Sequence, residues 1–198
     1  MIRAFIAIPL PDSLLEELIT VQKSLKKQTP RRSIRWTKPE GIHLTLKFLG
    51  DISTDSLPDI KQALTFVAQH APASLFTAKE LGCFPRPSRP RVLWVGVQEP
   101  TGRLAALQKA IEEAMESLGF EPERRKFHPH LTLGRVRRKA SRSETAQVSK
   151  VIARTTVEPL AEIAADRFAL IRSVLKPTGA EYTTLEEFSL TSSGNQLA

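Results

Sequence analysis

The sequence contains the same four-residue string, His-Leu-Thr-Leu, twice: at residues 43–46 and again at residues 130–133. The chain has only four histidines, and two of them stand at the head of this string. With the Leu and Thr frequencies of this chain as the prior, Leu-Thr-Leu follows a given His by chance about once in a thousand. The repetition therefore indicates a shared function or an internal duplication.

Each string is predicted to lie on a β-strand, in which successive side chains point to opposite faces. In the first copy His43, Thr45 and Lys47 would share one face, and in the second copy His130 and Thr132 would do so. We expect the other face of each strand to be buried against helices. Its residues are Leu44, Leu46 and Phe48 in the first copy and Leu131 and Leu133 in the second.

Two imidazoles and two hydroxyls suit the chemistry of a phosphodiester. The ordinary imidazole pKa is about 6.5, so one histidine can be a neutral base while the other is a charged acid. In-line displacement at phosphorus needs both, because one group takes a proton from the nucleophile and the other protonates the leaving oxygen. Threonine hydroxyls can donate to the phosphate oxygens on which charge accumulates. If the two strings face each other, they would form a metal-independent phosphodiesterase site.

Other interpretations of the same residues remain open. A single His-x-Thr on a strand is usually a half-buried histidine with satisfied hydrogen bonds, and a duplication without function would also preserve both copies. A metal site would use His43, His128 and His130, but no acid or Cys lies nearby in the sequence to complete the ligand set. Structural roles are expected for the remaining unusual residues: His70 at a helix end, Cys83 in the core, and Trp36 and Trp94 in the core or stacked on a base.

The formal net charge of +8 favours a polyanionic partner. Residues 18–39 contain seven Lys or Arg and residues 124–143 contain eight, and neither segment contains an acid. Both segments adjoin the repeated strings, which favours a phosphate-bearing ligand; solvated surface charge is the alternative, for these and for the small cluster of Arg86, Arg89 and Arg91. The lone Cys excludes an internal disulfide. Neither a signal peptide nor a membrane span is expected, which points to a cytoplasmic protein.

Apolar periodicity predicts strands and helices in an order that occurs twice. A shift of 87 positions superposes Phe5 on Val92 and each string on its copy. We therefore expect an α+β fold of one bilobal domain, made of two duplicated halves (approximately 1–88 and 89–198), with pseudo-symmetric lobes that are mostly antiparallel sheets flanked by helices and an active-site cleft between them. Helices are expected at 11–27, 53–69, 101–119 and 141–154, the first and last with capping boxes at Ser13/Glu16 and Ser141/Glu144. Strands are expected at 4–10, 43–49, 74–84, 92–97, 130–136, 160–175 and 181–190, with a proline-rich loop at 85–91 and a final hairpin around 176–179.

Four segments carry a resemblance to a known family: FIAIPLP (5–11), HLTLKFLG (43–50), RVLWVGV (91–97) and FHPHLTLGRV (127–136). With its paired His-x-Thr motifs at this separation, the chain resembles the 2H phosphoesterases, and within them the LigT-like RNA 2',3'-cyclic phosphodiesterases, long called 2'-5' RNA ligases. The resemblance spans nearly the whole chain. It implies a hydrolase that converts an RNA 2',3'-cyclic phosphate to a 2'-phosphomonoester and can also run in reverse as a 2'-5' ligase.

The resemblance also implies roles for individual residues. His43 would be the proton donor to the departing 3' oxygen, His130 the proton acceptor from the attacking water, and Thr45 and Thr132 the residues that bind the phosphate. Arg135 matches a phosphate-contacting arginine of the family, but strict alternation places it on the leucine face.

A bulge at Gly134 would turn Arg135 toward the phosphate. The resemblance implies an RNA partner with a cyclic phosphate end and no metal, no cofactor, no membrane and no protein partner, and we expect a monomer. Chemistry alone leaves open which histidine is the acid and which oxygen departs. The rival hypothesis is a non-catalytic protein that binds RNA ends.

Overall fold

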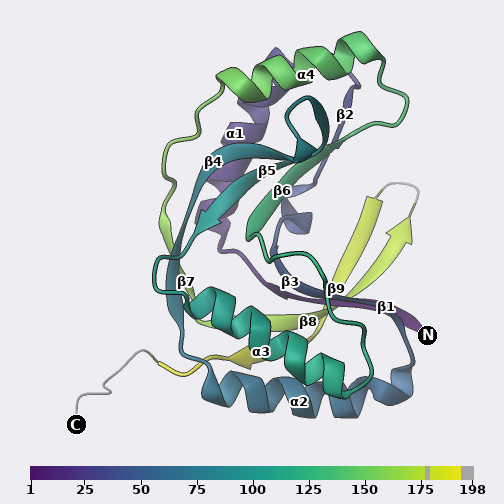
Figure 1. Ribbon diagram of the computed structural model, residues 1–198, viewed down its shortest axis with the longest axis vertical. Helices are drawn as coiled ribbons and strands as arrows, with labels where there is room; N and C mark the ends of the chain where they lie inside the picture. Colours follow the sequence, from purple (N-terminus) through teal and green to yellow (C-terminus); the bar gives the residue numbers. More distant parts are fainter. Residues whose placement is uncertain (177–178, 193–198) are drawn as a thin grey trace.

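The computed structural model describes residues 1–176 and 179–192, and within them the chain forms four α-helices and a nine-stranded sheet (Figure 1). All pairings between strands of this sheet are antiparallel. The helices are α1 (Asp12–Gln28), α2 (Leu57–His70), α3 (Arg103–Ser117) and α4 (Arg142–Arg154). The strands are β1 (Ile2–Ile8), β2 (Ile34–Trp36), β3 (Leu44–Ile52), β4 (Ser74–Arg86), β5 (Arg89–Gln98), β6 (His130–Val136), β7 (Glu162–Ala165), β8 (Arg167–Lys176) and β9 (Gly179–Ser189).

The sheet consists of two parts that meet at one residue pair. The strand order is β7-β4-β5-β6-β3-β1-β8-β9, with β2 also paired to β6. Between β6 and β3 the pairing is limited to Leu131 and Leu44. The strands β7, β4, β5, β6 and β2 form the upper lobe in Figure 1, and β3, β1, β8 and β9 form the lower lobe. The predicted α+β, bilobal architecture is therefore confirmed.

Each lobe combines elements from both halves of the sequence. The upper lobe contains β4 from the first half beside β5 and β6 from the second, and the lower lobe contains β8 from the second half beside β1. Helix α4 lies over the upper lobe, while α2 and α3 lie together on the lower one (Figure 1). Helix α1 belongs to the upper lobe, because the side chain of Gln22 donates to the carbonyl of Leu133 in β6 at 2.7 Å. The division into duplicated halves near residue 88 stays a prediction.

The predicted apolar faces of the helices form most of the core. Leu14, Leu18 and Leu25 of α1 are fully buried, as are Ile60 and Leu64 of α2. Burial of a Leu or Ile side chain contributes roughly 1.5–3 kcal/mol, so these faces fix the helices on the sheet. Among the helices of the described residues, none combines the length and the apolar character needed to cross a membrane.

Several local predictions differ from the structure. The capping box at Ser141 is present, but the one at Ser13 is wrong: α1 begins earlier, at Asp12, because the carbonyl of Pro11 already accepts from Leu15. The strand expected at 160–175 is two separate strands, β7 in the upper lobe and β8 in the lower lobe. Strand β2 was not predicted, since three residues are too few to show a period. The loop expected at 85–91 is a tight hairpin between β4 and β5; the turn of the final hairpin includes residues 177–178, which lie outside the described residues.

Candidate active site

The two His-x-Thr motifs meet at the junction of the lobes. Leu44 pairs with Leu131 in antiparallel register, and both are fully buried. For the residues that flank this pair, the register sets position 43 opposite position 132 and position 45 opposite position 130. Opposite residues of an antiparallel pair have side chains on the same face. Each histidine therefore lies beside the threonine of the other motif.

Both motif strands contain a bulge, and this corrects the predicted alternation. In β3 the pairing to β1 skips Leu46, so that Leu46 and Lys47 are both buried and Phe48 lies on the histidine face with 67% of its surface exposed. The prediction that Lys47 shares the histidine face and Phe48 the leucine face is wrong. The buried ammonium of Lys47 instead forms an ion pair with Glu112 of α3 and donates to the carbonyl of Glu121 at 3.1 Å.

The bulge in β6 occupies the equivalent position, 87 residues later. The pairing to β5 skips Leu133, so Leu133 and Gly134 are both buried and Arg135 is exposed. A Cβ at Gly134 would lie 2.8 Å from the side chain of Ile34, so this position of the bulge admits only glycine. The bulge returns Arg135 to the face of His130 and Thr132, and strict alternation does not hold here.

His130 has a fixed tautomer when it is neutral. Its Nδ1 lies 2.7 Å from the carbonyl oxygen of His128, and because a carbonyl only accepts, Nδ1 must carry the proton. The Nε2 lone pair is then free to take a proton. The ring packs edge-on against Phe84 of β4, with centroids 4.9 Å apart.

The pKa of His130 is lowered from its ordinary value. Burial is the main cause; the hydrogen bond to the His128 carbonyl acts in the opposite direction, and electrostatic interactions with His128 and Arg135 lower the pKa further. The lowered pKa favours the neutral form of the His130 imidazole at neutral pH.

His43 lies in an aromatic setting. Its ring stacks on Phe5 of β1 at 4.6 Å between centroids and meets the edge of Tyr182 of β9 at 5.4 Å. Burial, and after it the charge of His130, lower the pKa of His43 to about 4. The imidazolium form is thus costly in the unliganded site, and an anion beside the ring would offset that cost.

The polar side chains between the histidines have no internal partner. Within residues 1–176 and 179–192, neither the hydroxyl of Thr45 or Thr132 nor the guanidinium of Arg135 makes a hydrogen bond or an ion pair. Groups of this kind are available to a ligand. The structure thus brings His43, Thr45, His130, Thr132 and Arg135 to one face of the sheet.

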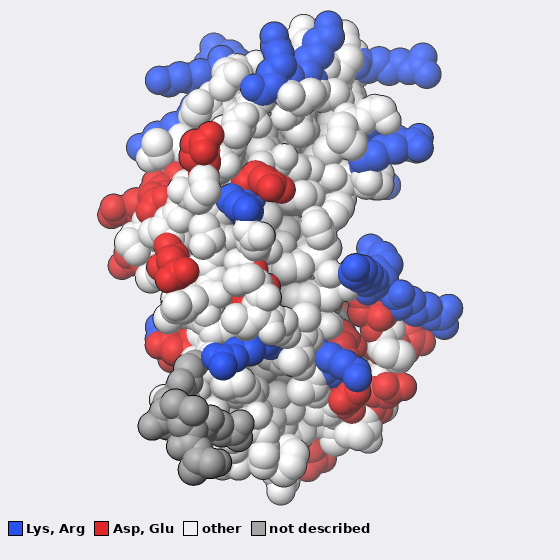
Figure 2. Space-filling model, turned by 60° about the vertical axis from the view of Figure 1, so that its left-hand side comes forward, with Lys and Arg blue, Asp and Glu red and all other residues white. Residues whose placement is uncertain are grey.

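The two sides of this site differ in character at equivalent positions. Phe48, together with Phe5 and Tyr182, makes the side around His43 aromatic. Arg135 makes the side around His130 basic. In the space-filling view the outline of the molecule is indented between the two lobes, and Lys and Arg gather at the end that holds α4 (Figure 2).

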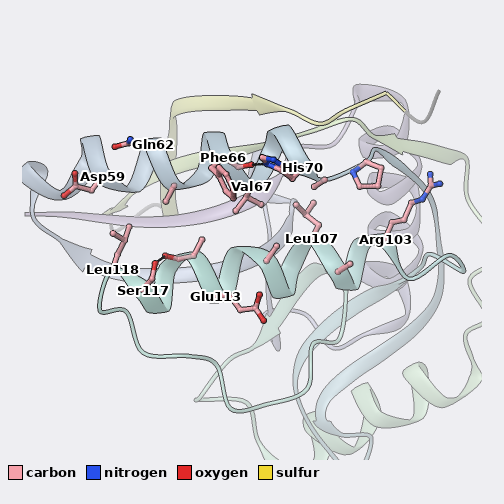
Figure 3. A pocket seen from close by; sticks show the side chains of 16 residues that line it. Asp59, Gln62, Phe66, Val67, His70, Arg103, Leu107, Glu113, Ser117 and Leu118 are labelled. Carbon is pink, nitrogen blue, oxygen red and sulfur yellow. Dashed lines mark hydrogen bonds between the residues drawn. The ribbon is translucent and has the colours of Figure 1, made fainter. Parts of the chain in front are cut away.

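A cavity of about 850 Å³ lies elsewhere, between α2 and α3 (Figure 3). Phe66, Val67 and Leu107 point into it, and the charged side chains of Asp59 and Arg103 lie toward its two ends. Most of its lining is apolar, and it does not contain the repeated motifs. It is therefore not a candidate for phosphoryl chemistry.

The other residues noted in the sequence have structural roles. His70 ends α2 with its Nδ1 2.8 Å from the carbonyl of Phe66, and Cys83 is buried in a small apolar cluster, as predicted. Trp36 packs against the core under the ammonium of Lys26. In the part of the chain that the structure describes, no three His, Cys, Asp or Glu side chains are grouped so as to hold a metal ion.

Sequence reasoning missed the residues that hold the histidines in place. Trp94 of β5 packs against Phe84 and against the ring of His128, at 5.2 and 4.9 Å. The indole covers Gly82 so closely that a Cβ there would lie 2.0 Å from it. A glycine inside a predicted strand signals close approach of a neighbour, so Gly82 was the one available clue.

Comparison with known proteins agrees with the geometry. Residues 8–94 and 95–182 each match the family described as LigT like Phosphoesterase, and the two matches begin 87 residues apart. Curated relatives include the RNA 2',3'-cyclic phosphodiesterase of Archaeoglobus fulgidus, 33% identical over 94% of this chain and 99% of that protein, and that of Thermotoga maritima, 35% identical over 93% and 94%.

Solved structures show the same fold. Escherichia coli LigT complexed with 3'-AMP has a TM-score of 0.74 and 26% identity, covering 96% of this chain and 98% of that one. A protein of Thermus thermophilus has a TM-score of 0.78 and 29% identity, covering 97% and 100%. Since the family matches twice over most of the sequence and curated members are more than 30% identical over nearly its full length, this chain belongs to the LigT-like phosphoesterase family.

Proposed function

We propose that this protein hydrolyses the 2',3'-cyclic phosphate at the end of an RNA to a 2'-phosphomonoester, with His130 as the base and His43 as the acid. The observation that carries the proposal is the crosswise placement of the two His-x-Thr pairs around the Leu44–Leu131 junction. The names of the curated relatives supply the substrate class.

The first half of the reaction uses His130. Its Nε2 is unprotonated while Nδ1 donates to the His128 carbonyl, and it accepts a proton from a water. The water oxygen forms a bond to phosphorus on the side opposite the leaving oxygen. Holding the ring in one tautomer removes the need to reorganise it during the reaction.

The second half of the reaction uses His43. As the bond from phosphorus to the 3' oxygen breaks, protonated His43 transfers its proton to that oxygen and leaves a free 3' hydroxyl. In the unliganded site the pKa of His43, lowered to about 4, disfavours the imidazolium. The bound phosphate must raise that pKa on binding, because its negative charge favours the protonated ring.

Charge on the non-bridging oxygens is met by Thr45, Thr132 and Arg135. The two hydroxyls have no other partner in the described part of the chain, and Arg135 adds a positive charge on the same face. Preorganised donors of this kind each contribute roughly 10²–10³ in rate. No step of this scheme is routed through a metal or a cofactor.

The aromatic side of the site suits the terminal nucleoside. Phe48 presents an exposed ring on the same face as His43, and stacking of a base on an aromatic ring contributes about 1–3 kcal/mol without selecting a sequence. This orientation sets the base near Phe48 and the phosphate between the histidines.

The same groups can also join two RNA ends, with the cyclic phosphate again as the electrophile. If the 5' hydroxyl of a second RNA replaces water, His130 takes the proton of that hydroxyl and His43 again protonates the 3' oxygen. The new bond is then a 2'-5' phosphodiester. High concentrations of the two ends would be needed to favour ligation over hydrolysis by water.

The test is incubation of the protein, after dialysis against EDTA, with an RNA that ends in a 2',3'-cyclic phosphate, followed by mapping of the product phosphate. The expected product is the 2'-phosphomonoester, at a rate unchanged by the chelator. Tight binding of the end without any product would indicate a non-catalytic RNA-end binder, and loss of activity with EDTA would indicate a metal-dependent reaction.

A further inference from the structure

Two separate segments of the sequence that contain no acid become neighbours in the fold. Residues 18–39 include β2 and residues 124–143 include β6, and these strands pair with Arg35 directly opposite Arg135. The pairing runs from Trp36 and Gly134 at the active site to Ile34 and Val136 away from it. The basic character of both segments is therefore concentrated on one strip of the upper lobe.

Arg35 and Arg135 are both exposed, and directly opposite residues of an antiparallel pair lie on the same face. Like charges in this position destabilise a sheet. Neither guanidinium forms an ion pair within residues 1–176 and 179–192. An unneutralised pair of this kind on the face of the active site is the arrangement expected where an anion is bound.

The strip continues beyond the end of β6. The backbone N–H of Arg137 donates to the carbonyl of Ser33 at 2.8 Å, which extends the ladder, so alternation keeps Arg137 on the side of Arg135. There a hollow of about 490 Å³ opens, lined by Arg32, Arg137, Lys139, Ala140 and Glu144.

The one acid in this hollow is committed to another role. The carboxylate of Glu144 accepts from the backbone N–H of Ser141 at 2.7 Å as part of the capping box of α4. Arg32 holds a left-handed backbone conformation, φ 65°, which is uncommon for a residue with a side chain. Because Glu144 takes part in the helix cap, Arg32, Arg137 and Lys139 line the hollow without a dedicated counter-ion.

We propose that the basic track that continues from Arg135 (Arg35, Arg137, Arg32 and Lys139) binds the phosphates of the RNA body that precede the reacting end. The proposal rests on the proposed function, because a 2',3'-cyclic phosphate is the 3' end of an RNA and the rest of that RNA extends from the 5' side of the terminal nucleotide. The physiological substrate is thus an oligonucleotide and not a cyclic mononucleotide.

The length of the track fits several nucleotides. Five residue steps of extended strand, from Thr132 beside the reacting phosphate to Arg137, span about 16 Å. A stacked strand rises about 3.4 Å per nucleotide, so this length corresponds to roughly four or five phosphates. Contacts to phosphates carry no sequence information, so the track selects for RNA length and not for base sequence.

The test compares adenosine 2',3'-cyclic phosphate with a six-nucleotide RNA that ends in the same group. In the wild type the oligonucleotide is expected to have the higher kcat/KM, with a steep dependence on salt. Arg35→Gln and Arg137→Gln should each lower the ratio of the two kcat/KM values by about tenfold. Each should also reduce the slope of log kcat/KM against log salt for the oligonucleotide by about 0.7, the value for one phosphate contact on a single strand. Lys109→Gln, an exposed lysine on α3 of the other lobe, is the matched control and should leave the ratio unchanged.

The outcomes are distinguishable. If neither substrate is hydrolysed by the wild type, the proposed function itself fails. If both are hydrolysed but the ratio stays the same in Arg35→Gln and Arg137→Gln, or falls equally in Lys109→Gln, the basic track does not bind the RNA body. A variant that unfolds is identified by circular dichroism, and the wild-type ratio and salt slope of the two substrates then still test the proposal.

Discussion

Leu44 pairs with Leu131, and each is the counterpart of the other under the 87-residue repeat. When two equivalent residues pair in antiparallel register, the local two-fold axis passes between them. The consequence is that His43 lies beside Thr132 and His130 beside Thr45. The candidate site is therefore assembled from both motifs at once, and each motif contributes one histidine and one threonine.

The first prediction concerns the histidines. His43→Ala and His130→Ala should each reduce kcat on a cyclic phosphate end by about 10²–10⁴, the range for loss of a general acid or base. The measurement is initial-rate kinetics on folded protein. His70→Ala is the matched control, since this histidine is exposed at the end of α2 and bonds a carbonyl of its own helix. An equal loss in His70→Ala would contradict the assignment.

The second prediction concerns pH. The pKa of His43 is lowered to about 4 and that of His130 is lowered below its ordinary value. In the proposed reaction the active form has His43 protonated and His130 neutral. Above the pKa values of both groups the protonated fraction of His43 falls tenfold per pH unit, so kcat/KM should decrease from about pH 6.5 upward.

Binding of an anion should raise the pKa of His43. NMR titration of the ring protons should give a pKa of about 4 for His43 in the free protein and a higher one when phosphate is bound, because the phosphate charge favours the imidazolium. A pKa near 6.5 in the free protein, or a kcat/KM that rises up to about pH 8, would show that burial does not control this group.

The third prediction concerns Gly82. Because a Cβ here would lie 2.0 Å from the indole of Trp94, Gly82→Ala should push Trp94 toward His128 and His130. A displacement of about 1 Å in an active site can cost about 10² in rate, and kcat should fall by about that factor while KM changes little. The double variant Gly82→Ala/Trp94→Leu should recover part of the loss by restoring space. Normal kinetics in Gly82→Ala would mean that Trp94 does not position the histidine side of the site.

The fourth prediction concerns Lys47. Its side chain is buried beside Glu112, and Lys47→Met would leave the carboxylate without its cation. The free energy of unfolding in urea should fall by about 1–3 kcal/mol. Lys109→Met, which removes an exposed ion pair on the same helix as Glu112, should change it by less than about 1 kcal/mol. An equal loss of unfolding free energy in both variants would show that the buried ion pair contributes no more to stability than the exposed one.

Much of the fold was predictable from the sequence because the helices have clear apolar faces and the two motifs are identical. The bulges were harder to predict from the sequence. In the second copy Gly134 suggested a bulge. In the first copy the skipped residue is Leu46, and nothing in the sequence around it departs from a regular strand. An extra residue is set by the pairing with β1, which is distant in the chain, so alternation assigned Lys47 and Phe48 to the wrong faces.

The pairing of the lobes was also beyond local patterns. A repeated order of strands and helices does not say which strands become neighbours, and the exchange of β4 and β8 between the halves depends on contacts far apart in sequence. The same limit hid the partnership of Arg35 and Arg135. Both segments were recognisable as basic, but only the sheet brings them together. The roles of Phe5, Phe84 and Tyr182 likewise arise from neighbouring strands.

The proposed reaction gives the two histidines different roles, and a change of leaving group distinguishes the acid from the base. A substrate whose cyclic phosphate has sulfur in place of the 3' oxygen releases a thiolate, which needs no proton from an acid. His43→Ala should hydrolyse this substrate at nearly the wild-type rate while remaining impaired on the oxygen substrate, and His130→Ala should be impaired on both. If the sulfur substrate instead rescues His130→Ala, the acid and base are exchanged; if it rescues neither variant, the two-histidine account is contradicted.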